Sequence, residues 1–135
     1  MDESRHVAVT VAAPWREVYA WAADPRNLSL WAAGLARSPL QQIDGEWVAD
    51  SPMGRVTVRF APPNDVGVLD HTVVLPGGEE VDNPMRVLPH GDGAEVVFTV
   101  RRRGGMTAEA FDADVRAVQA DLDTLRRRFT EPPAP

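Results

Sequence analysis

Residues 106–129 read MTAEAFDADVRAVQADLDTLRRRF, and this stretch decides the fold. Its apolar side chains recur at steps of four and three residues, which is the spacing of one face of an α-helix. They are Phe111, Val115, Val118, Leu122, Leu125 and Phe129. The residues between them are mostly charged or small, and Thr107 is a suitable N-cap. We expect a long C-terminal helix over residues 106–129, and such a helix needs a broad apolar surface to pack on.

The first part of the chain predicts one strand and two short helices. Residues 6–11 alternate between apolar and polar or small side chains, as a half-buried strand does. A helix is expected over residues 15–23, and Asp24-Pro25 should end it because the position before a proline disfavours helical geometry. A second short helix is expected over residues 26–33.

The middle of the chain predicts a run of short strands separated by turns, of which Asp44-Gly45 is a strong hairpin signal. The expected strands cover residues 35–43, 46–50, 55–60, 67–75, 80–89 and 94–101. Strands followed by a helix indicate an α+β domain in which the helix covers one face of an antiparallel sheet. The expected helix-facing positions are Val56, Val58, Phe60, Leu69, Val73, Leu75, Met85, Val87, Val96, Phe98 and Val100.

Composition narrows the class of protein. The chain has 135 residues, 44% of them hydrophobic and 25% charged, values that predict one globular domain, here over residues 1–129, and a disordered tail over residues 130–135. The absence of cysteine excludes disulfides and thiolate metal sites, and the net charge of −6 argues against nucleic-acid binding. The polar start and the lack of a long apolar run predict a cytoplasmic protein that does not enter a membrane.

One segment resembles a known family. Residues 11–19 read VAAPWREVY, residues 23–28 read ADPRNL, and Trp31 follows. This pattern resembles the opening signature of the SRPBCC superfamily, which includes START-like domains, the birch-pollen-allergen fold and polyketide cyclase/dehydrase-like proteins. Residues 67–71 (GVLDH) and 83–86 (NPMR), with GDG at residues 91–93, are similar to a bacterial cyclase-like subgroup.

The resemblance implies a helix-grip fold. In that fold a curved antiparallel sheet of about seven strands grips the long C-terminal helix, and two short helices follow the first strand. It also implies a cavity between sheet and helix that holds a small, largely apolar ligand. Only some members of the superfamily are enzymes.

His71 is the most informative single residue. Alternation along residues 67–75 places it on the same face as Leu69, Val73 and Leu75, so it should point toward the helix. A histidine there is either a general acid/base and hydrogen-bonding group for a ligand or a core residue satisfied by one neighbour. Asp70 cannot form a dyad with it, because adjacent strand residues point to opposite faces.

Other candidate ligand-binding residues are expected around the same space. Asn83 is either a polar anchor in an apolar cavity or a residue that starts a strand before Pro84. Trp31 either caps the cavity or packs in the core, and the first turns of the long helix should form one wall opposite His71. The full set of expected ligand-binding residues is Trp31, His71, Asn83, Met85, Phe98, Met106, Phe111 and Val115.

These residues support two functional hypotheses. The first is binding of a small hydrophobic or amphipathic molecule between sheet and helix. The alternative is a cyclase or dehydratase that acts on a poly-β-keto or related aromatic precursor, with His71 as its catalytic acid/base. The three histidines, at positions 6, 71 and 90, lack zinc-ligand spacing, so we expect no metal and no cofactor. The protein is expected to be a monomer or a homodimer.

Overall fold

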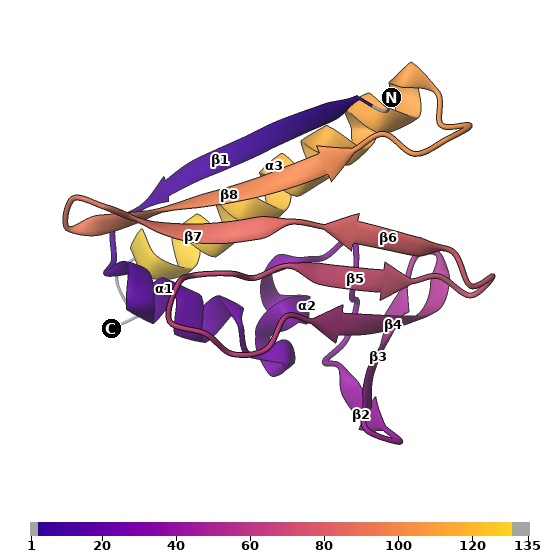
Figure 1. Ribbon diagram of the computed structural model, residues 1–135, viewed down its shortest axis with the longest axis horizontal. Helices are drawn as coiled ribbons and strands as arrows, with labels where there is room; N and C mark the ends of the chain where they lie inside the picture. Colours follow the sequence, from indigo (N-terminus) through magenta and orange to yellow (C-terminus); the bar gives the residue numbers. More distant parts are fainter. Residues whose placement is uncertain (1–2, 131–135) are drawn as a thin grey trace.

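The computed structural model describes residues 3–130, and the tail predicted over residues 130–135 lies almost entirely outside them (Figure 1). The expected order of one strand, short helices, further strands and a long helix is confirmed. The elements are β1 (Ser4–Val11), α1 (Trp15–Ala22), the 3-10 helix η1 (Pro25–Asn27), α2 (Leu28–Trp31), β2 (Gln41–Ile43), β3 (Glu46–Ser51), β4 (Gly54–Phe60), β5 (His71–Val74), β6 (Glu80–Asn83), β7 (Met85–His90), β8 (Gly93–Arg101) and α3 (Ala108–Thr130).

All strand pairs are antiparallel, in two groups. One group has the order β1-β8-β7 and the other the order β2-β3-β4-β5-β6. The fold is therefore α+β with an antiparallel sheet, as predicted.

The two groups of strands join at Pro84. The predicted strand over residues 80–89 is interrupted there, because proline has no N–H to donate to a neighbouring strand. Its carbonyl still accepts a hydrogen bond from the Thr99 N–H at 2.9 Å. The strand predicted over residues 67–75 also changes partner: its first residues hydrogen-bond to β7, through the Leu69 N–H to the Met85 oxygen, and only residues 71–74 pair with β6. Together these links make one curved sheet.

Two other predicted elements are shorter than expected. Only Gln41–Ile43 of the predicted strand over residues 35–43 is extended. The residues before it form an irregular segment that buries Ala36 and Leu40, with Pro39 between them. The second short helix divides into η1 and α2, because Asp24 accepts a hydrogen bond from the Arg26 N–H at 3.0 Å and starts a tight turn.

The long helix packs on the sheet as its periodicity predicts. Figure 1 shows α3 passing behind β1, β8 and β7. Phe111, Leu122 and Leu125 on its apolar face are at most 1% exposed. Thr107 Oγ1 accepts a hydrogen bond from the Ala110 N–H at 3.1 Å, so Thr107 is the N-cap, as expected. Within residues 3–130, no helix combines the length and apolar character that crossing a bilayer requires.

Candidate functional site

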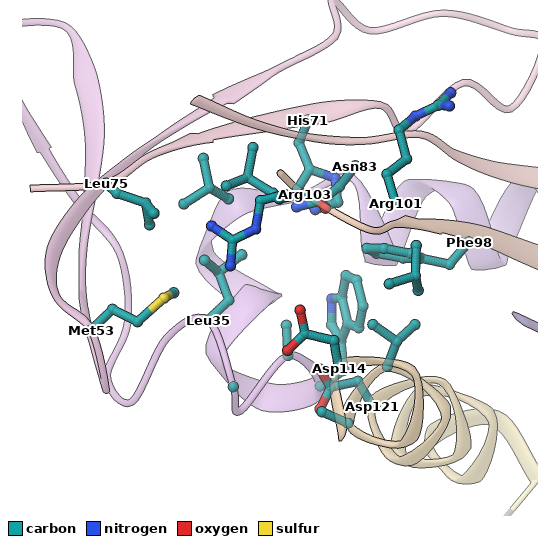
Figure 2. A pocket seen from close by; sticks show the side chains of 18 residues that line it. Leu35, Met53, His71, Leu75, Asn83, Phe98, Arg101, Arg103, Asp114 and Asp121 are labelled. Atoms are coloured by element: carbon teal, nitrogen blue, oxygen red, sulfur yellow. The ribbon is translucent and has the colours of Figure 1, made fainter. Parts of the chain in front are cut away.

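A cavity of about 180 Å³ lies between the curved sheet, α3 and the segment after α2 (Figure 2). Its sheet wall comes from β5, β6 and β8, and its opposite wall comes from the middle of α3. Most of the lining is apolar, which is the usual composition of a small-molecule site. The apolar side chains are those of Trp31, Ala32, Leu35, Met53, Val73, Leu75, Val81, Phe98, Val100, Ala117 and Val118.

The sheet wall carries two neighbouring polar side chains. His71 on β5 pairs directly with Asn83 on β6, and both line the cavity. His71 is 5% exposed, and Val73 beside it on the same face is also buried. The predicted inward orientation of His71 is therefore what the structure shows. The ring also contacts Phe98, with ring centroids 5.7 Å apart in an edge-on arrangement.

The protonation of His71 follows from its contacts. Its Nδ1 lies 3.0 Å from the Leu69 carbonyl oxygen. Because a carbonyl can only accept, Nδ1 carries the proton and Nε2 keeps a free lone pair. Burial lowers the pKa of His71, and the Leu69 hydrogen bond and the charge of Asp70 offset this in part. At neutral pH the side chain is thus a neutral hydrogen-bond acceptor at Nε2.

Asp70 itself is engaged on the other face of the strand. Its carboxylate accepts hydrogen bonds from the Arg86 guanidinium and from the Met85 N–H, the latter at 2.9 Å. It does not orient the His71 ring, as the alternation of the strand indicates.

The helix wall carries two carboxylates, Asp114 and Asp121, on the same side as Ala117 and Val118. Burial raises the pKa of the Asp121 carboxyl to about 6, and a hydrogen bond from the Ala33 N–H lowers it in part. Burial likewise raises the pKa of Asp114, and the charge of Arg103 lowers it in part. The cavity therefore combines an apolar lining with two acids that are less acidic than usual.

The wall formed by α2 contains a buried indole. Trp31 lines the cavity and is 3% exposed. Its Nε1 is buried and has no hydrogen-bond partner within the described residues. Buried indole N–H groups are normally paired, so this donor is an exception that a bound molecule would explain.

Arginines lie at the edge of the cavity. The Arg103 guanidinium pairs with Glu79 at 3.3 Å. Figure 2 shows the Arg101 side chain directed away from Asp114 and Asp121, and its guanidinium lies 3.5 Å from Ser4 Oγ. Each of the two guanidiniums thus has a partner on the protein.

The structure brings together half of the expected ligand-binding residues. Trp31, His71, Asn83 and Phe98 line the cavity. The other four lie elsewhere: Met85 and Phe111 are fully buried in the core, and Met106 and Val115 are half-buried against it. The reason is the placement of α3, whose early turns pack on β1, where Arg5 covers the Phe111 ring at 5.1 Å.

The two acids on the helix wall are absent from the residues expected from the sequence. Asp114 and Asp121 are charged, and charge alone favours the solvent side of a helix. Their spacing carries a signal, since positions 114, 117, 118 and 121 follow the i, i+3, i+4, i+7 pattern of one helix face. Within residues 3–130, no three histidine or acidic side chains gather closely enough to hold a metal ion.

The raised pKa of Asp121 predicts that Asp121→Asn increases the stability of the fold in a pH-dependent way. Above about pH 6 the carboxyl is ionised in the folded protein, where its buried charge lowers the stability. Below pH 3.8 it is protonated in both the folded and the unfolded protein. The loss of stability therefore grows as the pH rises from 3.8 to about 6. The amide keeps an acceptor for the Ala33 N–H and never ionises. We expect the variant to be more stable by about 1 kcal/mol at pH 7.5, after allowing for solvent screening, and equal to the wild type at pH 4. Urea unfolding at both pH values measures this; a gain of equal size at both would contradict it.

Comparison with known proteins supports the fold. Neither a protein-family model nor a curated protein sequence matches the chain. Among solved structures, the protein XoxI from Bacillus cereus matches with a TM-score of 0.74 and 12% identity, over 95% of this chain and 96% of that one. Ara h 8.0201 matches with a TM-score of 0.72 and 12% identity, over 98% of this chain and 100% of that one.

DynU16, a protein in the dynemicin biosynthetic locus, matches with a TM-score of 0.72 and 17% identity. The match covers 97% of this chain and 48% of DynU16, so this chain spans about half of its length. At such identities the likeness shows the fold alone. That fold is the expected α+β arrangement of antiparallel strands, a long C-terminal helix and short helices after the first strand.

Proposed function

We propose that this protein binds a small hydrophobic or amphipathic molecule in the cavity between the curved sheet and α3. The observation that carries the proposal is the cavity itself, which is lined mainly by apolar side chains and contains a few polar groups. Apolar walls supply affinity by removing ligand surface from water, and His71, Asn83 and Trp31 supply orientation.

The size of the cavity limits the ligand. Drug-sized ligands occupy pockets of about 300–1,000 Å³, and a dry cavity of about 150 Å³ holds a benzene molecule. A cavity of about 180 Å³ therefore fits a compound with one substituted ring. A long-chain lipid would extend out of the cavity or would need the walls to move apart.

A thermal-stability series tests the proposal. A ligand that binds only the folded state raises the unfolding midpoint, by several degrees when its concentration is a hundredfold above Kd. We expect one-ring aromatic compounds such as ethylbenzene to raise the midpoint and palmitate to have no effect. If no compound of either size changes the midpoint, the proposed function is wrong.

The second candidate function is catalysis with His71 as a general base. It is favoured by one observation: the neutral ring presents an unprotonated Nε2 while Nδ1 is held by the Leu69 carbonyl. Removal of a proton next to a ketone is the first step of an aldol-type cyclisation, and a positioned base accelerates such a step by about 10²- to 10⁴-fold.

His71→Gln separates binding from catalysis. We expect the wild type to speed the exchange of the acetophenone methyl protons for deuterium in D₂O, and the variant to lose at least about 100-fold of that acceleration. The affinity for ethylbenzene should stay within about threefold, because glutamine retains most of the side-chain volume. Proton NMR follows the exchange. An equal exchange rate with and without the wild-type protein would rule out this candidate.

A further inference from the structure

The buried donor of Trp31 indicates what kind of group the cavity is built to receive. An indole N–H that is removed from water without a partner is destabilising, and a phenylalanine ring would fill similar space without that penalty. Trp31 combines nearly complete burial with a place in the cavity wall. A hydrogen-bond acceptor on a bound molecule would satisfy its Nε1.

None of the acceptors near this wall forms a hydrogen bond with Trp31. Asp121 accepts a hydrogen bond from the Ala33 N–H, and Asp114 interacts with the charge of Arg103. The rest of the wall is largely apolar, and its two other polar side chains, His71 and Asn83, form no hydrogen bond with Trp31 Nε1. Within the part of the chain that the structure describes, the partner of Trp31 is therefore missing. Because Nε1 is shielded from solvent, an acceptor that enters the cavity reaches it only when the surrounding side chains shift slightly.

The charges around the cavity indicate that this acceptor is neutral. A ligand carboxylate would lie in the same cavity as Asp114 and Asp121, and both are hard to ionise there already. The nearby guanidiniums are directed to other groups, Arg103 to Glu79 and Arg101 to Ser4. A carbonyl or ether oxygen accepts the indole hydrogen bond without adding charge.

We propose that the cavity takes a neutral one-ring compound whose carbonyl or ether oxygen accepts a hydrogen bond from Trp31 Nε1–H. This inference rests on the proposed function and narrows its ligand class. It also makes Trp31 the residue that distinguishes an oxygenated ring from a plain hydrocarbon of the same shape.

The test measures three probes on two proteins. Acetophenone carries the acceptor, ethylbenzene has nearly the same shape without it, and benzoate carries a charged acceptor. Calorimetry at pH 7.5 gives Kd for each on the wild type and on Trp31→Phe, which removes the N–H. Trp47→Phe is the matched control, because Trp47 is also partly buried but does not line this cavity.

We expect Trp31→Phe to raise the Kd for acetophenone by about tenfold, because acetophenone loses a hydrogen bond. The Kd for ethylbenzene should change by less than about twofold. Trp47→Phe should leave both affinities unchanged, and benzoate should bind the wild type more weakly than acetophenone.

Other outcomes separate the two proposals. If Trp31→Phe weakens the binding of acetophenone and of ethylbenzene equally, this inference is wrong while the proposed function stands. The same holds if benzoate binds the wild type more tightly than acetophenone does. If neither neutral probe binds the wild type, both are wrong. Should Trp31→Phe fail to fold, the NMR chemical shift of the Trp31 indole N–H proton in the wild type decides. This resonance should move downfield when acetophenone is added and should not move with ethylbenzene. Equal movement with both compounds overturns the inference.

Discussion

Gly67→Ala is expected to destabilise the protein by about 4 kcal/mol. Gly67 has a φ of +77°, and a Cβ atom at this position would lie 2.0 Å from the Val87 carbonyl oxygen. The backbone strain and the steric overlap each cost about 1–3 kcal/mol. The overlap is with the Val87 backbone, which cannot move aside without separating the residues around Gly67 from β7. The same backbone contact includes the hydrogen bond from the Val87 N–H to the Gly67 carbonyl at 2.9 Å, which ties the residues before β5 to β7.

Gly45→Ala is the matched control, because Gly45 has a φ of +82° and a Cβ atom added there would have no neighbour within 4 Å. Its free energy of unfolding should fall by about 1 kcal/mol, because only the cost of placing alanine at a positive φ applies there. Urea unfolding of both variants gives the comparison. Equal losses would show that residues 67 and 87 do not approach each other as closely as the structure has them.

The second large effect is expected from filling the cavity from its helix wall. Val118 is half-buried and lines the cavity, so a phenyl ring in its place would occupy space that the ligand needs. We expect Val118→Phe to weaken ethylbenzene binding by about 30-fold, which corresponds to about 2 kcal/mol of steric conflict. The unfolding free energy should change little, since the ring enters a space that is not already packed.

Val115→Phe is the matched variant for this experiment. Val115 is also a half-buried valine on α3, one turn earlier, but it packs against the core and does not line the cavity. It should lose stability through overpacking and keep its affinity for ethylbenzene within about threefold. Calorimetric titration of both variants is the measurement. A reversed result would place the ligand against the first turns of α3.

Much of the fold could be predicted because it depends on local periodicity. The apolar stripe predicts α3 to within two residues at each end, and Thr107 is its N-cap. Alternation along the strand is enough to turn His71 inward, because strand side chains point to opposite faces in turn. The elements that differ from the prediction are those in which a proline or a change of strand partner overrides the pattern, as at Pro84.

The site was harder to predict because it depends on where elements meet. The cavity lies against Asp114 to Asp121 and not against Met106 or Phe111, since this depends on how α3 crosses the sheet. Periodicity defines which face of a helix is buried, but it does not say which part of that face is packed and which part borders an open space. Charge is also misleading here, because Asp121 is partly buried and held by a backbone N–H of the segment after α2.

A titration with ethylbenzene followed by methyl-resolved NMR tests the central claim most directly. If the cavity binds a small apolar molecule, the methyl resonances of Val73, Val81 and Val118 shift together and saturate at one Kd, because all three side chains line it. The exposed Leu30 and Val66 should not respond. Shifts confined to those exposed residues, or no saturable shift at any cavity methyl, would contradict the claim that this cavity is a binding site.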